Sequence, residues 1–270
     1  DDGLLREAEP GLYRQIVHAT RFPGAELVAI TPDVHVGYGV PVGSVILTDR
    51  DAGALAMGPV GFDIGCGMTS ARSDVSAGRA THERKLRFHR EVMARVALGP
   101  GGRSERFGEL SREELQDVAR GGAEHYASKY GSPIERSRSE KQRFPVDDGW
   151  DIPFGGPGVP ERGAAQLGTL GGGNHFIELQ RCEEEGTLFV QLHTGSRGFG
   201  HGLATNYFER ARSEHPDVEH DLGFFDPRSP HFDGYRNAVA AGANFAIVNR
   251  LVIYEAVAEA FEKVFGGTLE

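Results

Sequence analysis

The sequence has little of what holds small secreted proteins together or anchors proteins in membranes. Only two of its 270 residues are cysteines, Cys66 and Cys182, which excludes a disulfide-built scaffold. No apolar run approaches the roughly 20 residues of a membrane-spanning helix, which excludes a transmembrane protein. Residues 1–5 do not begin a basic segment followed by an apolar core, so no signal peptide is expected. A reducing, cytoplasmic location is therefore predicted.

Positive charge is also scarce. The chain has 29 Lys and Arg residues against 39 Asp and Glu residues, a formal net charge of −10. A protein that coats nucleic acid by neutralising phosphates needs a surplus of basic residues, so the charge argues against that class. An enzyme that acts on nucleic acid remains compatible with this charge if a basic cleft forms locally.

Glycine, in contrast, is abundant, with 38 residues. Because glycine is costly to order, its clusters mark places where the backbone must turn sharply or approach another group closely. The composition, 39% hydrophobic and 25% charged, is typical of a globular protein, and the length suits one large domain or two small ones.

Apolar periodicity predicts a mixture of strands and helices. Buried strands are expected at residues 26–31 and 44–48, and further strands at 174–180 and 187–193. Helices are expected at residues 10–20, 84–98, 111–130 and 201–213. A last helix at 233–265 would be roughly 50 Å long, with Gly242 as a candidate kink.

Between about residues 99 and 165 the chain is rich in Gly, Arg, Ser and Pro, which predicts a loosely structured surface excursion rather than a separate domain. The irregular order of elements favours one α/β (mixed α+β) domain over residues 1–270, with a central mixed sheet flanked by helices.

Four glycine-containing segments carry side chains suited to metal or phosphate binding. In residues 32–43, Asp33 and His35 share one face of an extended segment, which fits a supporting role in a site and a plain strand end equally well. In residues 60–68, glycines flank Asp63 and Cys66, so a tight loop could bring both to one ion. A cysteine is more often a small core residue, but that role does not need the glycines.

The other two segments lie next to the predicted strands 174–180 and 187–193. In residues 167–178, clustered glycines can cradle phosphate oxygens, while His175 and Glu178 suit a ligand and its partner; the alternative is a hinge before a strand. No Walker A or Rossmann pattern is present there. In residues 191–201, His193 leaves a buried strand and Arg197 lies in the following turn, where a phosphate would bind. A structural histidine is the alternative.

Together these segments offer the ligands Asp63, Cys66, His175 and His193. This mixed set suits Zn²⁺, Fe²⁺ or Mn²⁺, with Zn²⁺ first on grounds of softness. The four could close one tetrahedral site, or a bridging Cys66 could begin a two-metal site for phosphoryl transfer. Spacing alone does not choose between these.

In this order, segments 33–39, 63–67, 167–176 and 193–198 resemble those of the RtcB family of RNA-splicing ligases, and residues 244–250 resemble a segment of that family's long helix. The resemblance covers nearly the whole chain except the 99–165 excursion. It implies a ligase of tRNA splicing or RNA repair that joins 2′,3′-cyclic phosphate or 3′-phosphate RNA ends to 5′-hydroxyl ends, with GTP and Mn²⁺.

The resemblance also implies residue roles. Asp63, Cys66 and His175 would hold one Mn²⁺, and Cys66 would bridge to a second ion held by His193; Zn²⁺ remains a possible occupant. Arg197 would grip the RNA 3′-phosphate. The expected contacts with GTP are Asn174, His175, Phe176, Ile177 and Glu178.

The family has a further histidine ligand, a histidine that becomes guanylylated and a lysine that contacts the nucleotide, all in segments beyond those matched here. The chain is therefore expected to be the N-terminal two-thirds of such a ligase. Two alternatives stay open: a metal-dependent phosphodiesterase or phosphatase of RNA ends, and an inactive metal- or RNA-binding fragment. An activating protein partner is also open, and no membrane partner is expected.

Overall fold

The axis of the molecule is one long helix, α8 (Phe232–Phe265). The computed structural model describes residues 9–132 and 142–270, so residues 1–5 and part of the 99–165 excursion lie outside the described residues. Helix α8 runs unbroken through Gly242, contrary to the expected kink. A Cβ on Gly242 would lie 2.8 Å from the side chain of Ile64, so this glycine permits close packing rather than a bend. The helix ends at Gly266, which is left-handed (φ 70°).

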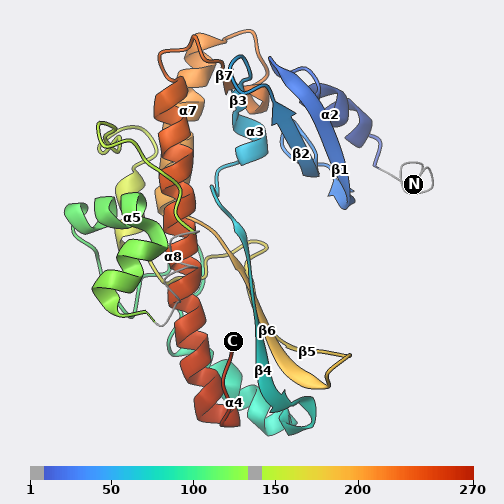
Figure 1. Ribbon diagram of the computed structural model, residues 1–270, viewed down its shortest axis with the longest axis vertical. Helices are drawn as coiled ribbons and strands as arrows, with labels where there is room; N and C mark the ends of the chain where they lie inside the picture. The colour runs from blue at the N-terminus through green and yellow to red at the C-terminus, as the bar shows by residue number, and fades with distance from the viewer. Residues whose placement is uncertain (1–8, 133–141) are drawn as a thin grey trace.

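A three-stranded antiparallel sheet lies along the lower half of α8 (Figure 1). Strand β6 (Thr187–Thr194) is central, between β4 (Gly67–Ser76) and β5 (Phe176–Arg181). Alternate residues of β6 are buried, and they form one core with the C-terminal half of α8 and with α4 (His82–Met93). The other face of β6 carries His193.

A second core surrounds the N-terminal half of α8, where α7 (Arg197–Glu214) and α5 (Arg112–Tyr130) pack against it. The α5 segment breaks at Gly122, whose φ of 52° turns the chain between two helical stretches. Leu115, Val118 and Tyr126 of α5 are at most 1% exposed. The part of the 99–165 excursion that contains α5 is therefore core rather than loose surface. Short elements complete this half: β3 (Leu55–Ala56), α3 (Met57–Val60), η2 (Pro160–Ala165), η3 (His220–Leu222) and β7 (Phe224–Phe225), while η1 (Ala77–Arg79) follows β4.

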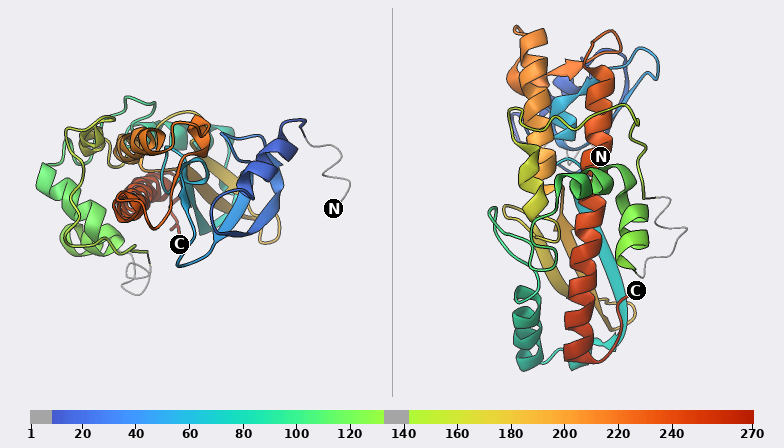
Figure 2. Two further views of the ribbon diagram at one scale, coloured as in Figure 1. Left: turned by 90° about the horizontal axis from the view of Figure 1, so that it is seen from above. Right: turned by 90° about the vertical axis from the view of Figure 1, so that its left-hand side faces the viewer.

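The third sheet stands beside the helices at the upper end (Figures 1 and 2). Strands β1 (Ala25–His35) and β2 (Val42–Thr48) pair antiparallel, and α2 (Leu12–Ala19) covers one face. The prediction that both strands are buried is wrong: Leu27 and Leu47, opposite each other, are 57% and 52% exposed. The described elements cover only the Val28 and Ile46 side of this sheet.

The mixed α/β class is confirmed, but the strands do not form one central mixed sheet. Across residues 9–132 and 142–270 they form three small sheets of two, two and three strands, and each of these strand pairs is antiparallel. The β1–β2 sheet packs against α2, the β3–β7 sheet against the core around the N-terminal half of α8, and the β4–β6–β5 sheet against the C-terminal half of α8. No common layer therefore joins the three sheets. Within the described residues, no helix has the length and apolarity to cross a membrane.

Candidate metal centre and phosphate-binding turn

Asp63 and Cys66 lie in the short loop between α3 and β4. Left-handed glycines at positions 61 (φ 72°) and 65 (φ 73°) allow the loop to turn twice, and the Cys66 amide donates to the Asp63 carbonyl at 2.9 Å. A Cβ on Gly65 would lie 2.8 Å from the Ala243 Cα, so only glycine lets this loop rest on α8. The glycines flanking the carboxylate and the thiol thus shape the loop.

The two histidines come from neighbouring strands of the lower sheet. Phe176, the first residue of β5, is paired with His193 near the end of β6, and His175 immediately precedes it. The strand alternation places His193 on the face turned away from α8. Two strand ends and the α3–β4 loop therefore bring Cys66, His175 and His193 to one point.

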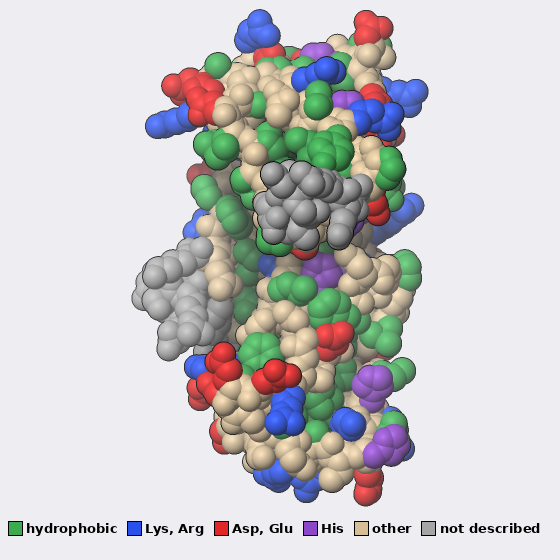
Figure 3. All heavy atoms as spheres, turned by 90° about the vertical axis from the view of Figure 1, so that its right-hand side faces the viewer, with side chains coloured by type: hydrophobic (Ala, Val, Ile, Leu, Met, Phe, Trp, Pro, Cys, Tyr) green, Lys and Arg blue, Asp and Glu red, His purple; other side chains and the backbone are tan. Residues whose placement is uncertain are grey.

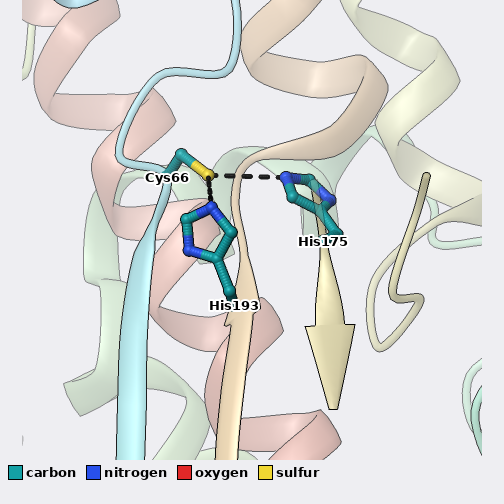
Figure 4. Close-up of side chains that lie close together, drawn as sticks. All are labelled: Cys66, His175 and His193. Atoms are coloured by element: carbon teal, nitrogen blue, oxygen red, sulfur yellow. Dashed lines mark hydrogen bonds between the residues drawn. The ribbon is translucent and has the colours of Figure 1, made fainter. Parts of the chain in front are cut away.

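The cysteine sulfur lies between the two imidazoles (Figure 4). Cys66 Sγ is 3.4 Å from His175 Nε2 and 3.3 Å from His193 Nε2. His175 Nε2 is also 2.8 Å from Asp63 Oδ2. All four residues predicted as metal ligands are thus brought together, although 130 residues separate Asp63 from His193 in the sequence.

The hydrogen bonds on the far side of each ring fix which atoms face the centre. His175 Nδ1 is 2.8 Å from the Leu170 carbonyl and His193 Nδ1 is 3.2 Å from the Gly67 carbonyl. A carbonyl only accepts, so each ring donates from Nδ1, and the atom left to bind a metal is Nε2, which faces the sulfur and, in His175, also the Asp63 carboxylate. Sulfur, imidazole and carboxylate acceptor atoms that converge in this way need a proton or a cation between them. The donor set therefore fits a divalent metal ion, with the second-sphere carbonyls holding both ligands in the metal-binding tautomer.

The pKa values of Asp63 and His193 are shifted in the direction that metal binding requires, and that of Cys66 is not. Burial acts to raise the pKa of Asp63, but hydrogen bonds from His175 and Cys66 and the charge of Arg197 outweigh it and hold that pKa below the usual value. Burial, with the charge of His175, lowers the pKa of His193, which favours the neutral ring. The exception is Cys66, whose pKa is raised to about 12 by desolvation and by the Asp63 carboxylate. A bound cation would reverse this, because metal binding displaces the thiol proton.

Arg197 begins α7 directly beside this centre. Its φ of 52° lies in the left-handed region, which is unfavourable for a residue with a side chain and is a feature of functional sites. The guanidinium donates from Nε to Thr169 Oγ1 at 3.2 Å and from Nη2 to the Gly99 carbonyl at 3.4 Å. Gly171 has a φ of 93°, which favours glycine, and a Cβ there would lie 2.1 Å from Arg197 Nη1. These neutral contacts position the guanidinium and leave its charge available for an anion.

A polar pair on α8, Asn249 and Arg250, joins the loops that carry the ligands. The Asn249 amide, completely buried, accepts from the Gly168 amide at 2.7 Å and donates to the Thr169 and Gly195 carbonyls at 3.2 and 3.0 Å. Arg250 Nη1 donates to the Gly65 carbonyl at 2.7 Å and the Thr194 carbonyl at 3.1 Å. The two residues fall in the segment whose family resemblance was noted, but no role was predicted for them. The available signal is their position between two apolar runs of the helix, 245–248 and 251–254.

The residues predicted to contact GTP do not all face one way. Asn174 and Glu178 are exposed, and the Phe176 ring lies 5.8 Å from the His193 ring. Ile177 points to the opposite side of β5 and packs against the core formed by β6, α4 and the C-terminal half of α8. Asp33 and His35 lie at the end of β1, where the Asp33 carboxylate accepts from Thr31 Oγ1 and His35 Nδ1 is 2.9 Å from the Asp33 carbonyl, so both side chains bond within the strand rather than at the metal centre.

A second group of potential ligands lies on α5, where Glu114, Asp117 and His125 bring their donor atoms within 4.8 Å of one another. Glu114 is already held by other donors. It accepts from Lys129 and from Tyr130 Oη (2.7 Å), and His125 Nε2 is 3.1 Å away. The positive charge of Lys129 disfavours a cation there, so the Cys66 centre remains the better metal site.

The chain is similar to known proteins over nearly all of its length. Residues 15–270 match the family model described as tRNA-splicing ligase RtcB. The chain is 33% identical to the tRNA-splicing ligase RtcB of Archaeoglobus fulgidus over 97% of its own length and 58% of the relative's. It is 34% identical to the RNA-splicing ligase RtcB of Mycobacterium tuberculosis, over 95% of the chain and 63% of that protein. It thus spans roughly half to two-thirds of these relatives, and by the extent of the family match it belongs to the RtcB family.

Proposed function

We propose that this chain carries the metal-binding part of the active site of an RNA ligase. The reaction proposed is the joining of RNA ends that bear a 2′,3′-cyclic phosphate or a 3′-phosphate to ends that bear a 5′-hydroxyl, with GTP as the co-substrate. The guanylylated histidine of this scheme belongs to a segment outside the matched sequence. A cytoplasmic location is part of the proposal, because an unpaired thiol ligand needs reducing surroundings.

The observation that carries the proposal is the convergence of Cys66 Sγ on the Nε2 atoms of His175 and His193, at 3.4 and 3.3 Å. We assign Mn²⁺ to this centre, with Asp63, Cys66, His175 and His193 as the residues that would hold it, and two ions if the sulfur bridges. When bound, the ions would neutralise and position phosphate oxygens during displacement at phosphorus.

The residues of the chain then have distinct tasks. The Arg197 guanidinium, positioned by Thr169 and the Gly99 carbonyl, binds the RNA 3′-phosphate beside the centre. Asn249 and Arg250 keep the ligand-bearing loops together. The exposed turn that contains Asn174, with Phe176 and Glu178 on the following strand, is proposed to contact GTP.

The surface charge suits an enzyme with a small basic site better than a protein that coats RNA. On the face drawn in Figure 3, the Lys and Arg side chains of the coloured residues are interspersed with Asp and Glu and form no continuous basic patch. The half-buried guanidinium groups of Arg197 and Arg250 therefore contribute much of the positive charge near the metal centre.

The test uses Cys66→Ala with Cys182→Ala as the matched control, since Cys182 is the other cysteine and lies at the end of β5, outside the ligand set. Binding of Mn²⁺ is measured by calorimetry and by the loss of the free-ion electron paramagnetic resonance signal. We expect Cys66→Ala to lose metal binding and RNA joining, and Cys182→Ala to keep both. Metal binding by Cys66→Ala at the wild-type affinity would refute the assignment. Opening of cyclic phosphate ends without GTP and without joining would instead favour the phosphodiesterase alternative.

A further inference from the structure

A cleft of about 620 Å³ opens directly beside the candidate metal centre. Asp63 and Cys66 form part of its lining, so the cleft and the metal centre are continuous. Its volume is in the range of sites that hold a small organic ligand such as a nucleotide. Much of the wall is apolar and comes from two helices, α3 and α8; these residues are Pro59, Val60, Val239, Ala240 and Ala243.

One wall of the cleft comes from the segment 144–147, which lies across α8 and is held at both ends by buried asparagines. The Phe144 amide donates to Asn244 Oδ1 at 2.8 Å, and Asn244 Nδ2 donates to the Phe144 carbonyl at 2.9 Å. Two helical turns earlier, the Asp147 amide donates to Asn237 Oδ1 at 2.7 Å, and Asn237 Nδ2 donates to Asp147 Oδ2 at 2.9 Å. Both asparagines are at most 4% exposed. The segment is thus a rigid strap rather than a loose loop.

The strap presents an aromatic ring to the cleft. Phe144 lines the cleft and is 49% exposed, although its backbone is fixed on both sides by Asn244. It lies next to the part of α8 on which the Gly65–Cys66 loop rests, through Ala243. An exposed phenyl ring on a fixed backbone is the kind of group on which proteins stack single-stranded bases, and stacking does not depend on base identity.

The far end of the cleft is polar. Arg236 and Asp147 are about half exposed there and form an ion pair of 3.2 Å. Asn237 and Asn244 are seven residues apart on α8, so this end lies roughly 10 Å along the helix from the ring. A phosphate at the metal centre, a base on the ring and a polar edge or ribose hydroxyl toward Arg236 fit this order.

Resting on the proposed function, we propose that this cleft binds the 3′-terminal nucleotide of the RNA strand whose phosphate meets the metal centre, with Phe144 as the stacking platform for its base. Phe144 is then a positioning residue, which holds the 3′-phosphate at the metal centre through the base attached to it. The 5′-hydroxyl strand would lie elsewhere.

The test is a double-mutant cycle between the ring and the base. Affinity of the chain is measured by fluorescence anisotropy, with Mn²⁺ and without GTP, for a short RNA ending in a 3′-phosphate and for the same RNA with an abasic terminal nucleotide. Since stacking on one aromatic side chain contributes about 1–3 kcal/mol, Phe144→Ala should weaken binding of the normal RNA by roughly 5- to 150-fold. The same variant should bind the abasic RNA as the wild type does.

Two further variants make the result specific. Phe144→Trp should retain binding and show fluorescence quenching when a base stacks on it, against a background of the single native Trp150. Leu86→Ala, which removes an equally exposed (49%) apolar side chain on α4, should change nothing. Manganese binding should be the same in Phe144→Ala and the wild type, which separates this test from that of the metal centre.

Two outcomes would overturn the inference. The first is equal affinity of Phe144→Ala and wild type for the normal RNA, with Mn²⁺ binding intact, in which case the proposed function stands without this nucleotide site. The second is a double-mutant cycle in which Phe144 couples to the base at the 5′-hydroxyl end of a second strand rather than to the base at the 3′ end. If the wild-type chain itself does not bind Mn²⁺, it is the proposed function that fails.

Discussion

The β1–β2 sheet and the β4–β6–β5 sheet are both antiparallel, yet they are stabilised very differently. The lower sheet packs one face on α8 and α4, and Leu188, Val190 and Leu192 of its central strand are at most 2% exposed. The upper sheet buries only the side that faces α2, and its other side leaves Leu27, Val45 and Leu47 more than half exposed.

The difference extends to the loops that follow the strands. At the end of the lower sheet, Asn249 and Arg250 of α8 satisfy buried carbonyl and amide groups of three loops. At the end of β1, Asp33 is exposed and its side chain is held by Thr31 of the same strand. Precise placement of metal ligands therefore depends on long-range packing against α8, which the upper sheet lacks among the described residues.

The largest expected effect compares one leucine from each sheet. Leu192→Ala on β6 should lower the free energy of unfolding by roughly 2–5 kcal/mol, because it leaves a cavity in the core. Leu47→Ala on β2 should lower it by less than about 1 kcal/mol, because that side chain is 52% exposed. Urea unfolding of both variants measures the contrast. Equal losses would show that Leu47 is covered in the protein in solution.

An intermediate effect concerns the glycines of the site. A Cβ on Gly195 would lie 2.3 Å from Asp63 Oδ2, so Gly195→Ala should displace the carboxylate and weaken Mn²⁺ binding by roughly 10- to 100-fold. Gly101→Ala is the matched control, because nothing lies within 4 Å of a Cβ at that position. Calorimetric titration of both variants with Mn²⁺ tests this. Unchanged affinity in Gly195→Ala would remove Asp63 from the ligand set.

The smallest expected effect is a pH dependence. Burial acts to raise the pKa of Glu114, but hydrogen bonds from Lys129, Tyr130 and His125 outweigh it and hold that pKa below the usual value. A carboxyl whose pKa is lower in the folded state stabilises the protein above its unfolded-state pKa of roughly 4.3, and loses that contribution as the pH falls through the folded-state value.

Glu114→Gln should therefore cost about 1 kcal/mol of unfolding free energy at pH 7, and the difference from wild type should shrink below about pH 4. Asp33→Asn on the upper sheet is the comparison. The Thr31 hydroxyl lowers the pKa of Asp33 as well, but this carboxylate is exposed and its variant should follow the wild-type curve. Chemical unfolding at several pH values measures both. A constant difference for Glu114→Gln would contradict the assigned pKa direction.

Local sequence patterns predicted most of the helices and strands, and the four side chains proposed as metal ligands lie close together in the fold. Ile253, Val257, Phe261 and Val264 recur at helical spacing in the sequence of the long helix, and all four side chains are buried in the core that α8 forms with β6 and α4. The glycines around Cys66 and His175 marked loops that must turn sharply. Such signals are local, because an apolar period or a glycine cluster reports on the backbone of its own segment.

The rest depends on contacts between distant segments. An apolar run such as residues 44–48 has the same composition whether one or both sides of its strand are covered, so burial of β2 was overestimated. Segment 99–165 is rich in residues typical of loops, but α5 packs in the core and Asn244 fixes Phe144 from 100 residues away. Asn249 and Arg250 gave no local signal of their bonds to three loops, which only the folded chain brings together.

Because α8 is continuous, it sets the distance and the relative rotation of the two sites it supports. The asparagines that fix the strap and the polar pair that holds the metal loops lie on one rigid rod, at positions 237, 244, 249 and 250. Inserting one residue between positions 245 and 248 would rotate one set by about 100° relative to the other. The spacing between cleft and metal centre is therefore fixed by helical geometry, and changes of chain length in this helix are far less tolerable than changes in the surface loops.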